Sequence, residues 1–94
     1  MSDNAAHLDP VKVRAFAQDL QGTVAYYKRV IDMMESRLGQ LGKTWRDQEY
    51  EAFVGEVKNL KRGLTTYIEE ANAAHARLLH LATEAENYQK IQVR

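Results

Sequence analysis

Residues 50–88 read YEAFVGEVKNLKRGLTTYIEEANAAHARLLHLATEAENY, and their apolar side chains recur at a spacing that alternates strictly between three and four. This alternation is the heptad period of a coiled coil, and no proline interrupts it. The stretch therefore predicts one long amphipathic helix whose apolar stripe packs against other helices rather than facing water. The stripe consists of Tyr50, Phe53, Val57, Leu60, Leu64, Tyr67, Ala71, Ala74, Leu78, Leu81, Ala85 and Tyr88.

A second apolar stripe precedes this helix, and its spacing is three, four, four and then alternately three and four. The additional four before Val24 is a stutter, which locally relaxes a left-handed supercoil. Asp9 and Pro10 mark the start of the helix, because Asp9 can accept a bond from a free backbone N–H and proline is tolerated in the first turn. The stripe consists of Val13, Phe16, Leu20, Val24, Tyr27, Ile31, Met34, Leu38 and Leu41.

A short segment bracketed by Gly39 and Gly42 separates the two stripes. Glycine is common where helices end, because it adopts the left-handed conformation without strain. The following residues fit a capping box, in which the Thr44 hydroxyl accepts from the backbone N–H of Asp47 and the Asp47 carboxylate reaches back to that of Thr44. The segment therefore predicts a turn between two helices.

These features predict an all-α fold, an antiparallel helical hairpin that forms a single domain. Because the stripes are continuous and no repeat or linker divides them, no second domain is expected. The expected boundaries are residues 1–94 for the domain, about 10–39 for helix 1, about 40–44 for the turn and about 45–91 for helix 2.

The unequal lengths of the two helices predict how the chain assembles. With the turn centred near residue 42, Pro10 lies opposite roughly residue 75, since both helices rise equally per residue. Residues 76–94 then overhang with apolar side chains that helix 1 does not cover. Both stripes are also wider than one partner requires. On helix 2 the residues after Phe53, Tyr67 and Leu81 are apolar as well, and helix 1 shows the same excess at Tyr26, Val30 and Met33.

The simplest way to cover these surfaces is a four-helix bundle made by two chains. We expect a homodimer, or a heterodimer with a related hairpin. The expected seam of this dimer or bundle contains Phe53, Val57, Leu60, Leu64, Tyr67, Leu78, Leu81 and Tyr88.

The composition argues against several classes of function. Lys plus Arg and Asp plus Glu number 13 each, so no net field attracts the chain to nucleic acid or an anionic membrane. Cysteine is absent, which excludes disulfides and thiol chemistry. His80 and Glu84 share a helix face, but two ligands do not make a metal site. With no nucleophile beside a base and no phosphate loop, we expect neither an enzyme nor a cofactor or metal.

The N-terminal residues MSDNAAHLDP lack a basic stretch followed by an apolar core, and no apolar run approaches the length of a membrane span. We therefore expect no membrane insertion. The expected location is the cytoplasm, with any secretion proceeding without a cleaved signal peptide.

Trp45-Arg46-Asp47 in the expected turn, followed by Tyr50 and Phe53, resembles the WXG family of early-secreted-antigen-like proteins. In that family two helices are joined by a turn bearing Trp-x-Gly, and type VII secretion systems export the chains. Asp47 stands where most of the family has glycine. The sequence is most similar to a branch in which Trp-Arg-Asp replaces Trp-x-Gly and the hairpin forms a homodimer.

The resemblance implies a non-catalytic protein that acts as a dimer and is a substrate or partner of a type VII-like secretion system. The C-terminal export motif of the family, Tyr-x-x-x-Asp/Glu, is matched by Tyr88 but ends here on Gln92. The residues that would be recognised by a partner are those of the turn motif, Thr44, Trp45, Arg46 and Asp47.

Two interpretations of Trp45 follow, and two of the whole chain. Trp45 lies off the main stripe, so it either closes the open end of the hairpin against Leu38 or Leu41, or forms a partly exposed recognition feature. The whole chain is either the secretion protein described above or a cytosolic structural or adaptor protein whose bundle binds a partner helix.

Overall fold

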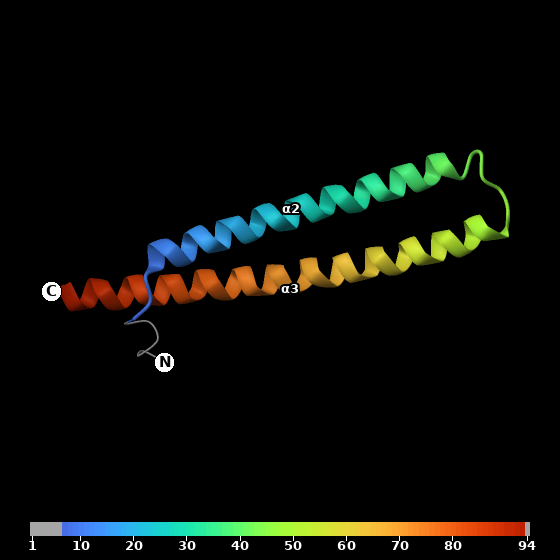
Figure 1. Cartoon of the computed structure of the whole chain (residues 1–94). Helices are drawn as coiled ribbons and strands as arrows, with labels where there is room; N and C mark the ends of the chain where they lie inside the picture. Colours follow the sequence, from blue (N-terminus) through green and yellow to red (C-terminus); the bar gives the residue numbers. More distant parts are fainter. Residues whose placement is uncertain (1–6, 94) are drawn as a thin grey trace.

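The structure is a computed structural model that describes residues 7–93, and it consists of two long helices (Figure 1). Helix α2 spans Pro10–Leu41 and helix α3 spans Gln48–Val93. They run antiparallel and side by side, with the turn at one end and the start of α2 beside the last part of α3 at the other (Figure 1). The predicted all-α helical hairpin is therefore confirmed.

The hairpin is long and only one layer thick. Its Cα atoms extend over 71 × 19 × 12 Å and their radius of gyration is 20.6 Å. A compact domain of this length would have a radius of gyration of about 12 Å. Because only two helices lie side by side, each helix keeps surfaces that the other does not touch.

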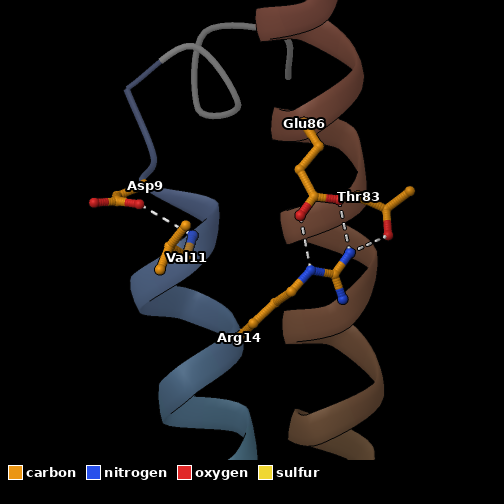
Figure 2. Close-up of polar contacts among 5 residues, drawn as sticks. All are labelled: Asp9, Val11, Arg14, Thr83 and Glu86. Atoms are coloured by element: carbon orange, nitrogen blue, oxygen red, sulfur yellow. Dashed lines mark hydrogen bonds and ion pairs between the residues drawn. The ribbon is translucent and has the colours of Figure 1, made fainter.

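Helix α2 begins where the sequence predicts, at Asp9 and Pro10. A carboxylate oxygen of Asp9 accepts hydrogen bonds from the backbone N–H groups of Val11, at 3.0 Å, and Lys12, at 3.5 Å. Figure 2 shows the bond to Val11 at the start of the helix. Since these N–H groups have no partner within the helix, the carboxylate satisfies them and fixes the first turn.

The turn differs from the predicted one in its boundaries and its caps. Helix α2 continues to Leu41, and α3 begins only at Gln48. Asp47 caps α3, since one of its carboxylate oxygens accepts from the backbone N–H groups two and three residues ahead, at 2.9 and 3.2 Å. The Thr44 hydroxyl instead donates to the carbonyl of Leu41 at 3.4 Å. The expected capping box is wrong because Thr44 serves the end of α2, which leaves Asp47 to begin α3.

Gly42 is needed for space and not for a left-handed backbone, since its φ is −65°. The Leu38 carbonyl accepts two hydrogen bonds, one from the Gly42 N–H and one from the Tyr50 hydroxyl, each 3.0 Å long. A Cβ atom at position 42 would overlap the Tyr50 hydroxyl and lie 2.8 Å from its ring carbon Cζ. Gly42 therefore allows Tyr50 of α3 to close the last turn of α2.

The α3 side of the seam is rotated from the predicted stripe. Twelve of the buried and half-buried positions of α3 form a series that again alternates by four and three, and Ala74, Leu79, Leu81 and Tyr88 are half-buried beside it. Half of them belong to the predicted stripe, and the other half follow its members by one residue, as Ile68 follows Tyr67. The seam positions of α3 are Tyr50, Val54, Val57, Lys61, Leu64, Ile68, Ala71, His75, Leu78, Ala82, Ala85 and Gln89.

The α2 side contains no stutter. Ala17 is 1% exposed, whereas the predicted Phe16 is 59% exposed and points away from the seam. With Ala17 in place of Phe16 the spacing becomes strictly three and four, so the supercoil continues without interruption. The seam positions of α2 are Pro10, Val13, Ala17, Leu20, Val24, Tyr27, Ile31, Met34 and Leu38.

The predicted overhang of residues 76–94 is also wrong over most of its length. Ala82 and Ala85 are completely buried, and Arg14 of α2 reaches Glu86 of α3. Before α2 begins, the Leu8 carbonyl accepts a hydrogen bond of 3.2 Å from the Gln89 side chain. The register differs because the turn occupies residues 42–47, so that α3 starts later than expected and α2 covers it almost to its end.

One long side of the hairpin carries ion pairs between the helices, and we call this side the polar face. The Arg14 guanidinium donates two hydrogen bonds of 2.8 Å to Glu86 and one of 3.1 Å to the Thr83 hydroxyl (Figure 2). The hydrogen bonds from Arg14 to Glu86 lower the pKa of the Glu86 carboxyl, and the positive charge of Arg14 lowers it further. Lys61 pairs with Glu35 farther along the same face.

We predict that Gly42→Ala lowers the free energy of unfolding by about 1 kcal/mol, because the displaced Tyr50 hydroxyl loses its hydrogen bond to Leu38. Urea denaturation followed by circular dichroism measures this. Tyr50→Phe should cost a similar amount, and the double variant little more than either. Gly39→Ala is the control, since a Cβ there meets nothing within 4 Å and alanine should raise helix stability by up to about 1 kcal/mol. Equal effects at positions 39 and 42 would contradict this role of Gly42.

We also predict that the Glu86 carboxyl titrates below the usual pKa of a glutamate. Because its pKa is lowered in the folded state, the ion pair stabilises the hairpin above the usual glutamate pKa of about 4.3 and the contribution is lost as the pH falls through the lowered value. A carbon-detected NMR titration measures the midpoint, and Arg14→Gln should raise it towards the usual glutamate value. An unchanged midpoint in that variant would exclude Arg14 as the cause.

Candidate functional site

The turn motif is held together by the side chain of Asp47. The same carboxylate oxygen that caps α3 accepts a hydrogen bond of 2.7 Å from the indole Nε1 of Trp45. One oxygen therefore fixes both the start of the helix and the orientation of the indole ring. The capping role of Asp47 is predictable from the sequence, but its bond to the indole is not, because that bond depends on how the turn folds the Trp45 ring back towards Asp47.

Trp45 is half-buried and lies against aromatic side chains of α3. Its ring meets Tyr50 edge-on, with centroids 5.6 Å apart, and Phe53 at a tilt, with centroids 5.8 Å apart. Such arrangements suit the quadrupoles of aromatic rings. The indole thus packs on one side and remains open on the other. It combines features of both interpretations, a side chain that closes the end of the hairpin and a partly exposed recognition feature.

The remaining residues of the turn motif are exposed beside the indole. Arg46 donates from Nε to the Lys43 carbonyl at 3.4 Å, and its side chain stays in solvent. A shallow hollow of about 440 Å³ lies on this side of the turn. Its walls are Gly42, Trp45, Arg46, Asp47, Gln48, Tyr50 and Glu51.

The second candidate site is the long side of the hairpin opposite the ion pairs. Along α3, a row of apolar residues at a spacing of seven lies beside the seam, and its member Leu60 is 62% exposed. On α2, Tyr26 is 55% exposed and Met33 is 45% exposed. We call this surface the apolar face and define it as Phe16, Tyr26, Val30, Met33, Phe53, Leu60, Tyr67, Ala74, Leu81 and Tyr88.

Aromatic contacts show that the residues from the two helices lie on the same side. Tyr27 meets Tyr67 edge-on across the seam, with ring centroids 5.1 Å apart. Tyr26 in turn meets Tyr27 at 5.5 Å. The apolar row of α3 and the exposed residues of α2 are therefore continuous, and the hairpin is amphipathic as a whole.

Near the turn the apolar face is hollowed into a groove of about 290 Å³. Six apolar side chains line it, and Arg37 provides the only charge. Both helices contribute, so the groove crosses the seam. Its walls are Met34, Arg37, Leu38, Leu41, Phe53, Val57 and Leu60.

The structure divides the predicted seam residues of α3 into two groups. Val57, Leu64 and Leu78 lie in the seam with α2. The others lie in the row of the apolar face beside the seam, where Phe53, Leu60 and Tyr67 are exposed and Leu81 and Tyr88 are half-buried. Their place in a dimer seam stays a prediction. The sequence signal for this division was the extra apolar residue that follows Phe53, Tyr67 and Leu81.

Within residues 7–93, no three His, Cys, Asp or Glu side chains gather closely enough to hold a metal ion. His80 and Glu84 do approach each other, with 3.2 Å between Nε2 and a carboxylate oxygen. Over the same described residues, neither helix is long and apolar enough to cross a membrane.

No protein-family model matches the chain, and no curated protein or solved structure shows a significant match to it. The turn motif and the apolar face are therefore the features of the molecule from which a function can be proposed.

We predict that Asp47→Gly, which introduces the residue more usual in Trp-x-Gly turns, lowers the free energy of unfolding by about 0.5–2 kcal/mol, the range for loss of an N-cap. It also removes the acceptor of the indole N–H. The fluorescence of Trp45, the only tryptophan, should shift to the red and become more accessible to acrylamide. Asp47→Asn is the control, since asparagine caps helices well and keeps a carbonyl oxygen for the indole. A quenching constant that stays the same in Asp47→Gly would contradict the anchoring role.

Proposed function

We propose that this protein is a non-catalytic, WXG-like helical hairpin that acts as a homodimer and is a substrate or partner of a type VII-like secretion system. The single observation that carries the dimer is the apolar face. A row of apolar side chains runs along α3 from Phe53 to Tyr88, and large apolar residues of α2 lie beside it.

An apolar surface of this extent favours assembly. The row of α3 extends over 36 residues, from Phe53 to Tyr88, about 50 Å at the rise of an α-helix. Monomeric proteins rarely expose continuous apolar patches larger than a few hundred Å². Pairing two such faces gives each helix a second neighbour and produces a four-helix bundle.

The turn motif supports the secretion part of the proposal. Trp45 lies at one end of the elongated molecule, half-exposed and held in one orientation by Asp47. Large aromatic side chains that are fixed before binding make favourable contacts at interfaces, because little conformational entropy is lost. Arg46 adds an exposed positive charge beside the ring.

Export is tested by producing the protein in a bacterium with an active type VII secretion system and measuring the fraction in the medium. We expect secretion of the natural chain and its loss in Trp45→Ala. Trp45→Phe keeps an aromatic ring and serves as a partial control for folding. Full secretion of a folded Trp45→Ala variant would exclude the turn motif as the recognised element.

A second candidate function is a cytosolic structural or adaptor protein that binds a partner helix. The observation that favours it is the groove near the turn, because apolar side chains from two helices form the kind of surface that takes an amphipathic helix. In that case the protein stays in the cell, and crosslinking through Leu41→Cys should capture a helical protein other than a second copy.

The dimer is tested by two aspartate substitutions one helical turn apart. Leu60 is 62% exposed in the hairpin, so Leu60→Asp should convert the dimer into a helical monomer of lower melting temperature. Leu64 lies in the seam of the hairpin itself, where an unpaired carboxylate costs several kcal/mol against a marginal total, so Leu64→Asp should unfold the chain.

Sedimentation equilibrium and circular dichroism measure these outcomes. Asn59→Asp is the control, since Asn59 is exposed on the outer surface of α3 and its substitution should leave mass and helicity unchanged. A natural chain that is monomeric at micromolar concentration, or a Leu60→Asp variant that remains a dimer, would contradict the proposal.

A further inference from the structure

We propose that the groove near the turn binds an amphipathic helix of a partner protein, and that this helix carries acidic residues on one edge of its apolar stripe and basic residues on the other. The inference rests on the proposed role of this protein as the partner of another component, and it specifies the chemistry of that partner. It is independent of the dimer. The charged residues beside the groove and the contact of the groove with Trp45 support it.

The groove has the length of about two turns of a helix. Its α3 wall runs from Phe53 to Leu60, about 10 Å at the rise of an α-helix, and residues from Met34 to Leu41 of α2 form the opposite wall. Two walls of this length accept apolar side chains at positions i, i+3 or i+4, and i+7 of a third helix. Leu60 is 62% exposed, Leu41 40% and Phe53 37%, so a helix in the groove removes large apolar side chains from water.

The two edges of the groove carry opposite charges. Arg37 belongs to the α2 wall and is exposed. On α3, Glu56 follows Phe53 by three residues and precedes Leu60 by four, so helix geometry places it on the same face as both. Glu49 continues this edge, four residues before Phe53. Within residues 7–93, none of these three charged side chains forms an ion pair. The α2 edge is therefore positive and the α3 edge negative.

These charges define the occupant. A helix that lies along the groove has one edge over α2 and the other over α3. Acidic side chains on the first edge meet Arg37, and basic side chains on the second meet Glu56 and Glu49. A helix with the same charge on both edges meets repulsion on one of them. Charges at the rim of an interface select the partner more than they raise its affinity, so the mixed pattern identifies the partner.

The groove adjoins the turn motif through residues that the two share. Phe53 lines the groove and contacts the indole of Trp45, with ring centroids 5.8 Å apart. Leu38 also lines the groove, and its carbonyl accepts the hydrogen bond of 3.0 Å from the Tyr50 hydroxyl. The contacts that order the turn therefore also fix parts of both walls. A surface ordered before binding loses little conformational entropy, so the groove and the turn motif form one docking region at the tip of the hairpin.

Synthetic helical peptides and the fluorescence of Trp45 test the proposal. Three peptides share a stripe of leucines and lack tryptophan and tyrosine. The mixed peptide has glutamates on one edge and lysines on the other, the acidic peptide has only glutamates and the basic peptide only lysines. Trp45 reports binding because it is the only tryptophan and contacts Phe53. We expect the dissociation constant of the mixed peptide to be about threefold below that of either other peptide. Equal constants for the three would overturn the proposal.

Charge reversal at Arg37 tests the assignment of the edges. In Arg37→Glu both edges are negative, so the basic peptide should become the tightest ligand. Arg29→Glu is the control, since Arg29 is exposed on the outer surface of α2 and its reversal should leave the order of the three peptides unchanged. An Arg37→Glu variant that still prefers the mixed peptide would overturn the proposal.

Sedimentation equilibrium on the same samples separates this inference from the proposed dimer. Leu81→Asp changes the apolar face outside the groove and should break the dimer, with helicity checked by circular dichroism. Binding of the mixed peptide only to this variant would show that a second copy fills the groove of the natural protein, which overturns the inference and leaves the dimer intact. A natural chain that is monomeric and prefers the mixed peptide would contradict the dimer and support the inference.

Discussion

Close contact between α2 and α3 through small side chains is the constraint on which the hairpin depends. Four of its most completely buried residues are alanines, namely Ala17, Ala71, Ala82 and Ala85. Small residues let helix axes approach, and an aromatic ring at the same positions would hold them apart. The cost is a thin core, since each buried methyl group contributes only about 0.8 kcal/mol. A two-helix seam of this kind also leaves several large apolar side chains exposed, among them Phe16, Tyr26 and Leu60.

The location of those larger side chains makes the hairpin two-sided. Ion pairs from Arg14 to Glu86 and from Glu35 to Lys61 lie on one long side, whereas tyrosine, phenylalanine, leucine and methionine side chains gather on the other. The ion pairs are exposed and add little to stability, but they keep that side polar. The side left for assembly is therefore the apolar one.

The turn connects fold and proposed function through a single carboxylate. Asp47 caps α3 and holds the indole of Trp45 with the same oxygen, so the ring has a fixed orientation only when the helix has begun. Tyr50 joins the two helix ends by bonding to the Leu38 carbonyl over Gly42. The tip of the molecule is thus ordered by contacts within the turn together with the seam contact between Tyr50 and Leu38 that lies next to it.

The sequence by itself determined two long helices, their antiparallel connection and the cap at Asp9, because heptad spacing, proline position and capping chemistry act locally. It did not determine which rows of a broad apolar stripe face the other helix. Of three neighbouring rows on α3, two are wholly apolar and the third contains Lys61, His75 and Gln89, so hydrophobicity alone would not choose the third row. Packing against α2 nevertheless places this third row in the seam, with Ile68 and Ala82 buried and Tyr67 exposed. The register along the helices was likewise decided only in the folded structure. The turn spans residues 42–47, because the Thr44 hydroxyl bonds to the end of α2 and the Asp47 carboxylate caps the start of α3.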